Sequence, residues 1–276
     1  MRNVRRKLAF VLAASNHGTM IVNRFDRRTE DEDISNGVGV GFQLLEGAAF
    51  DPQEVELAVQ LLELRRHFHG DGVTAVDCGA NIGVHTVEWA TAMTGWGSVV
   101  ATEAQERIYY ALAGNITINN CFNAIAMHGA VAAEGGIMNI PTPDYFTASS
   151  FGSLELREGA QNEFIGQAID YSQANSVPIQ KIPLDALNLA RLDLIKIDVE
   201  GMEMEALEGA RTSIEKHHPI LLVESIKTSR EDLRGWMAAR GYQVIEAGLN
   251  VLAIHNSDPV LSKLNRAEPV TQASAA

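Results

Sequence analysis

The sequence predicts an α/β protein with a doubly wound, mostly parallel sheet and helices on both of its faces. Short apolar runs alternate with amphipathic stretches from about residue 73 to about residue 241. Strands and helices that alternate along a chain form a parallel sheet that the helices cover. The first apolar run leads into a glycine-containing turn, VDCGANIG at 76–83. Because such sheets bind ligands at the carboxyl ends of their strands, this turn is the first candidate for a site.

Residues 1–50 are expected to form an N-terminal extension that packs on the core. The apolar run Leu8–Ala14 follows a basic start and so imitates a secretion signal, but it is far too short to cross a bilayer. We interpret this run as a short amphipathic helix. The next stretch, HGTMIVNRFD at 17–26, predicts a strand of the folded body.

A first long helix is expected at 51–68. Asp51 suits the N-cap, Pro52 suits the first helical position, and Glu54 falls at position N3. Apolar side chains then recur with helical spacing and make one stripe: Leu57, Leu61, Leu64 and Phe68.

Seven further apolar runs predict the strands of the core. Five of them are buried strands, expected at 73–77, 98–103, 124–128, 192–200 and 219–224. The helices between and after them are expected at 84–93, 105–120, 203–216 and 229–241, the last with Ser229 as its N-cap and Gly241 as its stop. The runs YQVIEAG and NVLAIH, at 242–248 and 250–255, predict a closing antiparallel pair.

One segment breaks this alternation. Residues 141–181 are polar, with scattered Gly, Ser and Pro, and a loop of this length in a compact domain is usually functional. We interpret it as an insertion over the mouth of the site. The expected organisation is therefore an extension (1–50), one ligand-binding domain (51–256) and a flexible tail (257–276).

Composition narrows the function. The 276 residues carry a formal net charge of −13, which argues against nucleic acid as the main partner because phosphate binding needs a basic face. The two cysteines, Cys78 and Cys121, are typical of a reducing compartment, so we expect a cytoplasmic protein without an integral membrane segment. No Cys/His cluster suggests zinc. The oligomeric state cannot be predicted.

The turn at 76–83 suits an adenosyl ligand. Glycines permit close approach of the backbone, and the free N–H groups of the following helix favour an anionic group, which fits NAD, FAD or S-adenosylmethionine (SAM). A dinucleotide fingerprint that starts at Gly79 would need glycine at the positions of Asn81 and Val84, so it fails twice. Asp77 would repel a pyrophosphate, whereas it suits the ammonium group of SAM.

The second strand ends in Glu103, which lies 20 residues after Gly83. An acid at this distance accepts hydrogen bonds from ribose hydroxyls. We expect Ala80 and Asn81 in the turn, and Ala104 after the glutamate, to complete the ligand site. Ala130, after the third strand, is expected to pass the adenine by backbone contact.

The segments VDCGANIGVHT, ATEAQ and LIKIDVEGMEMEALEGA, with the helix that carries Asn115 and Asn119, resemble the FkbM family of SAM-dependent methyltransferases from about residue 70 to 225. The resemblance implies the class I methyltransferase fold, a seven-stranded sheet whose last strand is antiparallel. It implies SAM as cofactor, with Asp77, Gly79, Gly83 and Glu103 at the positions that contact it. Asn81 departs from the general class I loop but is usual in this family. The implied acceptor is a hydroxyl group on a sugar, glycan or secondary metabolite.

The stretch KIDVEG is the second candidate site. Lys196, Asp198 and Glu200 share one face if the strand stays regular, and Asp198 then emerges beside the cofactor. Methyl transfer to oxygen needs alignment and removal of a proton. We expect Asp198 to contact the reacting region, and Asp198 or Glu200 to act as base or to orient the acceptor. Alternatively, Glu200 caps the helix that follows and Lys196 pairs with a buried acid.

Several alternatives stay open. Asp198, Glu200 and Glu224 carry oxygen ligands suited to Mg²⁺ or Ca²⁺, but spacing alone is weak support, and we predict no metal. Competing functions are an NAD(P)-dependent oxidoreductase and a non-catalytic SAM-binding module. Further side chains have mainly structural interpretations: His85, His128, Asn115, Asn119, Cys78, Tyr145, Phe146 and Phe151, the three aromatic residues serving either as an acceptor pocket or as the insertion's own core.

Overall fold

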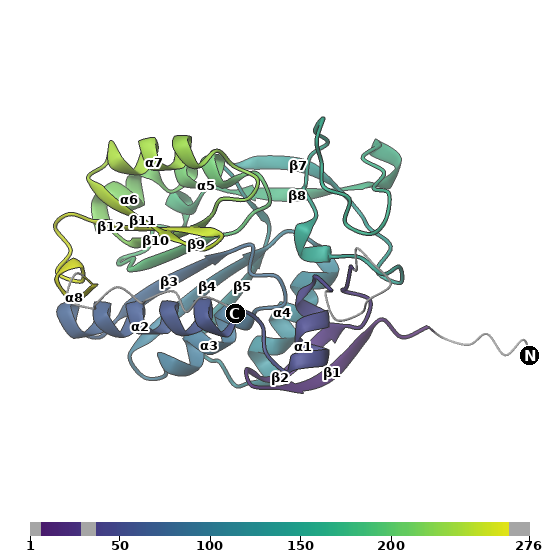
Figure 1. The fold of residues 1–276 in the computed structure, drawn as a ribbon, viewed down its shortest axis with the longest axis horizontal. Coiled ribbons are helices and arrows are strands. Elements are labelled where there is room, and N and C mark those ends of the chain that lie inside the picture. Colours follow the sequence, from purple (N-terminus) through teal and green to yellow (C-terminus); the bar gives the residue numbers. More distant parts are fainter. Residues whose placement is uncertain (1–6, 29–36, 265–276) are drawn as a thin grey trace, which may run out of the picture.

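A seven-stranded sheet forms the centre of the computed structural model, which describes residues 7–28 and 37–264 (Figure 1). In spatial order its strands are β11 (Tyr242–Ala247), β12 (Asn250–His255), β10 (Ile220–Glu224), β9 (Leu194–Ile197), β3 (Val73–Cys78), β4 (Gly97–Glu103) and β5 (Ala124–His128). The strand β12 runs antiparallel to both of its neighbours, and the pairs from β10 to β5 are parallel. The predicted fold class, including the antiparallel last strand, is confirmed.

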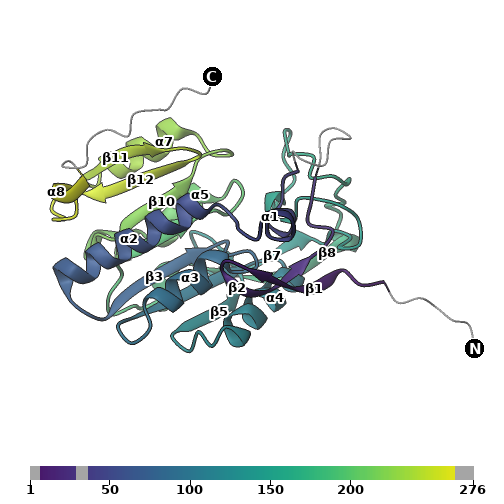
Figure 2. The ribbon, with the colours of Figure 1, turned by 60° about the horizontal axis from the view of Figure 1, so that its bottom comes forward.

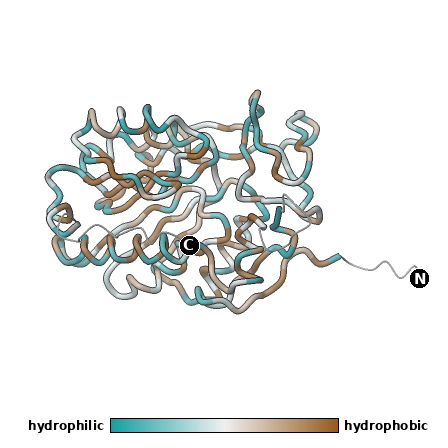
Figure 3. The backbone as a smooth tube through the Cα atoms, viewed as in Figure 1, coloured by the Kyte–Doolittle hydropathy of each residue, from teal (hydrophilic) through white to brown (hydrophobic). Residues whose placement is uncertain are grey.

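Helices cover both faces of this sheet, as Figures 1 and 2 show. One face carries α2 (Pro52–His69), α3 (Val84–Ala92) and α4 (Glu106–Ile118), and the other carries α5 (Glu203–Gly209), α6 (Arg211–His217) and α7 (Arg230–Ala238). Successive strand residues point to opposite faces, so Ala75 joins the first core and Val76 joins the second. The strands are accordingly among the most hydrophobic parts of the chain (Figure 3).

The N-terminal extension differs from the prediction. The run expected as a helix at 8–14 is a strand, β1 (Phe10–Ser15), which pairs with β2 (Gly18–Asn23) in an antiparallel hairpin. Gly18 has a φ of +97°, a conformation that permits the tight turn between them. A lone hairpin is marginally stable, so it needs a partner. It packs on α4, and the short helix α1 (Val40–Gly47) follows it.

Asn115 of α4 and Asn119, which caps the C-terminus of this helix, fasten the hairpin. The Asn115 side chain accepts a hydrogen bond from the Ile21 amide at 2.5 Å and donates one to the Ile82 carbonyl at 2.8 Å. The Asn119 side chain accepts a bond from the Thr19 amide at 3.1 Å and donates one to the Thr19 carbonyl at 2.8 Å. Both asparagines thus have the structural role that the sequence favoured.

The insertion has more structure than a loop. The strand β7 (Gly136–Pro141) leads into the segment expected at 141–181 and β8 (Ser176–Ile182) closes it; the two pair antiparallel and form a small sheet with β6 (Ala130–Val131). Short 3-10 turns lie at Phe151–Ser153, Gln173–Asn175 and Leu184–Leu187. The two strands escaped prediction because neither is a continuous apolar run: Asn139 lies within GIMNIP, and Pro178, Gln180 and Lys181 lie within SVPIQKI.

Two boundaries also differ. The helix expected at 203–216 is split into α5 and α6 after Gly209, where an added Cβ would lie 2.1 Å from the Ala132 carbonyl oxygen. Residues 257–264, expected as the start of a flexible tail, include a buried Val260 and the short helix α8 (Leu261–Leu264). The remainder of the tail, the basic start at 1–6 and residues 29–36 lie outside the described residues. Within the described part, no helix has the length and apolarity needed to cross a membrane.

Candidate active site

A cavity of about 320 Å³ opens at the carboxyl ends of the parallel strands. Its walls come from the turns after β3, β4, β9 and β10, from the N-terminal extension and from the insertion. Nearly all of the site residues expected from sequence line it: Asp77, Gly79, Ala80, Asn81, Glu103, Ala104, Ala130, Asp198 and Glu200. Gly83 does not line it. The structure thus brings these residues together, and their binding roles stay predictions.

The glycines of the turn after β3 serve its packing more than close approach of a ligand. A Cβ at Gly79 would lie 1.8 Å from the Asp198 carbonyl oxygen, and one at Gly83 would lie 2.5 Å from Leu112. Both glycines have positive φ values, +76° and +88°. Asn81 is also left-handed, with a φ of +51°, which asparagine tolerates better than most residues. The turn therefore fixes the distance between the ends of β3 and β9.

Asp77 holds a buried, unpaired oxygen at the cavity. One carboxylate oxygen accepts a hydrogen bond from the Thr86 hydroxyl at 2.6 Å, and Oδ1 has no partner among the described residues. The neighbouring Thr102 hydroxyl is also buried and unpartnered, and both residues line the cavity. Buried polar atoms normally have partners, so these two fit a polar ligand that completes them. An ammonium group suits Asp77.

Glu103 is held rigidly at the end of β4. Its carboxylate accepts hydrogen bonds from the amides of Asn81 at 3.0 Å and Gln105 at 2.7 Å, and the residue is 6% exposed. Burial raises the pKa of Glu103 to about 7, against the lowering effect of these amide bonds. Each carboxylate oxygen has a further lone pair, so the group can still accept ribose hydroxyls.

The KIDVEG segment leaves the regular strand early. The strand β9 ends at Ile197, and Glu200 is left-handed with a φ of +55°, so the expected alternation does not extend to Glu200. Glu200 does not cap the following helix either. No side chain caps α5, and the Glu203 carboxylate instead holds the preceding turn by accepting bonds from the amides of Gly201 at 3.0 Å and Val199 at 3.3 Å.

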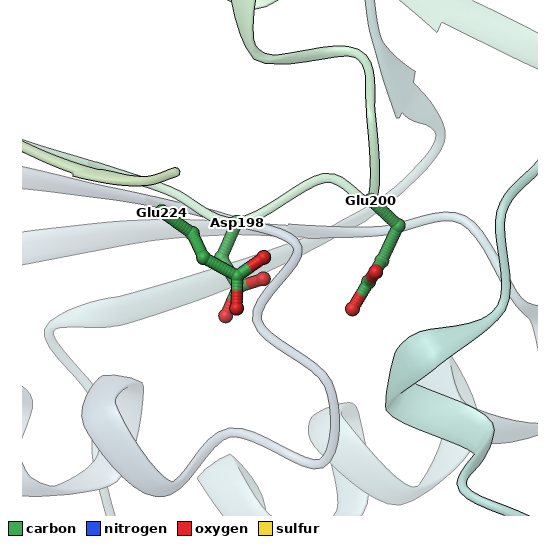
Figure 4. Close-up of side chains that lie close together, drawn as sticks. All are labelled: Asp198, Glu200 and Glu224. Carbon is green, nitrogen blue, oxygen red and sulfur yellow. The ribbon is translucent and has the colours of Figure 1, made fainter. Parts of the chain in front are cut away.

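Three carboxylates nevertheless converge at the cavity. Figure 4 shows Asp198, Glu200 and Glu224 directed to the same side of the strand ends, and one oxygen of each lies within 4.8 Å of the others. Burial, with the charge of Asp198, raises the pKa of Glu200 to about 8 and that of Glu224 to about 9. A carboxylate whose pKa lies near neutrality is suited to accept a proton.

Two lysines balance this cluster. The Lys196 ammonium lies 2.8 Å from Asp198 and is 6% exposed, and the Lys227 ammonium lies 2.5 Å from Glu200. Burial alone would lower the pKa of Lys196, but the charges of Asp198, Glu54 and Asp77 outweigh it and raise the pKa. The three carboxylates have the ligand chemistry for Mg²⁺ or Ca²⁺. With ammonium groups already on two of them, we keep the prediction that no metal is required.

The other candidate side chains have structural roles. His85 lines the cavity, 3.2 Å from Glu54, and His128 contacts the Ala104 carbonyl at 3.1 Å. Tyr145 packs against Phe151 and Phe10 and does not line the cavity. Phe151 belongs to the core on the α2–α4 face and Tyr145 packs against it, whereas Phe146 is 42% exposed and packs against Phe25. None of these three aromatic residues lines the cavity.

Sequence patterns missed part of the site. Its mouth includes residues from four distant segments: Val38, Gly39, Val40, Gln43, Phe50, Ser150, Gly152, Ser153, Leu154, Leu156, Ile226 and Leu249. These lie in loops and short elements without a motif. Thr102, which also lines the cavity, could have been predicted as a site residue, because it directly precedes Glu103 at the end of β4.

The part of the chain that matches a known protein family contains most of the candidate site. The family model of the methyltransferase FkbM domain matches residues 77–244, which is more than half of the chain. No curated protein matches the sequence. The chain is similar to the crystal structure of methyltransferase FkbM from Methylobacillus flagellatus KT, with 20% identity, a TM-score of 0.47, and coverage of 67% of this chain and 44% of that one. It thus spans less than half of that protein's length.

Two other solved methyltransferases are similar over most of their length. Precorrin-6y C5,15-methyltransferase from Geobacter metallireducens GS-15 is 13% identical, with a TM-score of 0.43 and coverage of 74% of this chain and 88% of that one. Magnesium protoporphyrin IX methyltransferase from Synechocystis PCC 6803, solved with bound SAM, is 12% identical, with a TM-score of 0.44 and coverage of 81% and 88%.

Proposed function

The chain belongs to the FkbM family of methyltransferases, and we propose that it uses SAM to methylate a hydroxyl group on a sugar, glycan or secondary metabolite. The observation that carries the cofactor assignment is the unpaired Asp77 oxygen, which lies in the same cavity as the Glu103 carboxylate. We assign Asp77 to the ammonium group and Glu103 to the ribose. The turn residues Gly79, Ala80 and Asn81, with Ala104 and Ala130, form the walls between them.

The chemistry is assigned to the acids at the ends of β9 and β10. When bound, SAM supplies a methyl group on a sulfonium centre. Asp198, held by Lys196, orients the acceptor hydroxyl, and Glu200 takes its proton as the new C–O bond forms and the S–C bond breaks. This division follows from the contacts and from the pKa of Glu200, because the Lys196 ammonium pairs with Asp198 at 2.8 Å, whereas burial raises the pKa of Glu200 to about 8. The acids mainly align and activate the nucleophile.

The charge of the protein and its cysteines bear on the class of acceptor and on the compartment. Acidic walls and a net charge of −13 fit a small-molecule or glycan acceptor and not a nucleic acid. Both cysteines are free and buried, which fits a reducing compartment such as the cytoplasm.

Calorimetry tests the cofactor assignment directly. We expect SAM and S-adenosylhomocysteine (SAH) to bind the purified protein, and NADH and NADPH not to bind. Binding of a nicotinamide cofactor in place of SAH would instead support an oxidoreductase.

A second measurement tests the catalytic assignment. Extracts of cells that lack the protein are incubated with it and with methyl-labelled SAM, and products one methylene heavier are sought by mass spectrometry. A labelled methyl group on an oxygen that was a hydroxyl group in the acceptor supports the proposal. SAH binding without any transfer would favour a non-catalytic SAM-binding module.

A further inference from the structure

We propose that Lys227 is a positioning residue for methyl transfer, which fastens the insertion beside the cavity and holds the Glu200 carboxylate in place. Lys227 lies in the loop between β10 and α7, and no sequence motif pointed to it. The inference rests on the proposed function, because it assigns Lys227 a part in the chemistry of Glu200.

The insertion arm, residues 150–163, contributes its first part to the lining of the cavity. Its Leu154 and Leu156 are buried and line the cavity wall, as do Ser150, Gly152 and Ser153. Gln105, directly after β4, donates a hydrogen bond to the Phe151 carbonyl at 2.8 Å and so anchors the arm on the cofactor side.

Lys227 makes the opposite anchor, on the acceptor side. Its ammonium group donates a hydrogen bond to the Ser153 carbonyl at 2.8 Å and lies 3.3 Å from Glu163 and 3.7 Å from Glu155. The fourth contact is Glu200, at 2.5 Å. The Lys227 side chain is only 12% exposed, so these contacts form away from bulk water, where charged pairs are strong.

The arm is preformed for this contact. The Glu155 carboxylate accepts a hydrogen bond from the Glu163 amide at 2.9 Å and another from the Asn162 side chain at 2.8 Å. These bonds place both acids of the arm beside one lysine. One cation therefore joins the arm to the loop that carries Glu200, and loss of the cation should affect both.

Glu200 faces several charged groups. Besides Lys227, they come from the end of β9, from β10 and from the start of α5: Asp198, Glu224 and Glu203. Glu155 and Glu163 of the arm face Lys227 on its other side. Lys227 is the cation in contact with Glu200 among the described residues, and it lowers the pKa of Glu200 against burial and the surrounding acids. Without this lysine the pKa of Glu200 should rise further.

The chain offers a matched control. Arg157, also in the arm, pairs with Glu205 of α5, with one bond at 3.0 Å. This pair is exposed and does not include Glu200, so Arg157→Met removes a bridge from the arm without changing the charge next to Glu200. Surface pairs of this kind contribute little.

The test uses the full chain and two readouts that need no acceptor. Amide hydrogen exchange reports opening of the arm, and carbon NMR of labelled glutamate carboxyls, with Glu200 assigned through Glu200→Gln, reports its pKa. In Lys227→Met we expect exchange in the arm to accelerate at least about tenfold, and the pKa of Glu200 to rise by about one unit or more. Lys227→Arg should restore both values.

A further variant keeps the test decisive if Lys227→Met does not fold. Lys227→Gln retains a donor for the Ser153 carbonyl but loses the charge that pairs with Glu155 and Glu163, so the arm should open less than in Lys227→Met while the pKa of Glu200 still rises. An unchanged pKa in Lys227→Gln, or equal opening in Arg157→Met, would overturn the inference. Binding of SAH by the wild-type protein is measured separately, so a failure of the proposed function would be recognised independently.

Discussion

The two halves of the cavity are built in different ways. The half at β3 and β4 consists of one continuous turn and one strand end, in which amide groups of Asn81 and Gln105 fix the Glu103 carboxylate. The half at β9 and β10 brings together distant loops and the insertion, and ion pairs hold it: Lys196 with Asp198, and Lys227 with Glu200. Under the proposed function, the first half would hold the cofactor and the second half the acceptor, so we call them the cofactor half and the acceptor half. Loops on a rigid sheet can change without disturbing it, which suits recognition of an acceptor.

The largest expected effect lies in the acceptor half. Asp198→Ala removes the group that orients the acceptor and leaves Lys196 buried without its closest partner, and we expect methyl transfer to slow about 1,000-fold. SAH affinity should change far less. The check is turnover with labelled SAM and the acceptor found for the wild-type protein. A folded variant with normal SAH binding and normal turnover would refute the role of Asp198.

The cofactor half is tested most strongly at Glu103. Glu103→Ala removes the carboxylate that accepts hydrogen bonds from the ribose hydroxyls and leaves two amides unpaired. We expect the binding free energy of SAH to weaken by about 3 kcal/mol, which calorimetry would show as an about 100-fold loss of affinity. Glu103→Gln keeps one acceptor oxygen and should lose less. An alanine variant that binds SAH as tightly as the wild-type protein would separate Glu103 from the ligand.

A smaller effect is expected at Asp77. Asp77→Asn keeps the size of the side chain but removes its charge, so an ammonium group loses one charge-assisted bond and SAH affinity falls about tenfold. Thr86→Val, which removes the hydroxyl bonded to the other Asp77 oxygen, serves as the control and should affect affinity less. If SAH affinity fell more in Thr86→Val than in Asp77→Asn, the position of the Asp77 side chain rather than its charge would control binding.

The pH dependence of SAH affinity should differ from the pH dependence of turnover. Each quantity should change by at most about tenfold per pH unit, because one group controls it. A carboxyl group with a raised pKa is protonated below that pKa. Affinity for SAH should therefore rise with pH up to about 7, where Glu103 ionises, and level off above it. Turnover should continue to rise through about pH 8, where Glu200 ionises. If both curves level off at the same pH, Glu200 is not the base.

The same contrast explains how far the sequence could predict the structure. The cofactor half follows from neighbouring residues, since an apolar run ending in Asp77 and a second ending in Glu103 define both the sheet and the edge where a ligand lies. The acceptor half depends on long-range packing. Lys227 and the arm meet across 74 residues of sequence, from Ser153 to Lys227, and no local pattern encodes that contact.

Two errors have the same physical origin. The segment at 8–14 contributes to a strand because it pairs with β2, which Asn115 and Asn119 hold in place, and its own short apolar run does not reveal these partners. The alternation expected for Lys196, Asp198 and Glu200 fails because Gly79 and Asp198 are in backbone contact, and the chain turns away from the strand there.

The central claim is tested most directly by a crystal structure of the protein with SAH. We predict that the adenosyl group of SAH lies across the ends of β3 and β4, with both ribose hydroxyls at Glu103 and the ammonium group of SAH at Asp77. SAH bound in another part of the molecule, or in this cavity with its ribose away from Glu103, would contradict it.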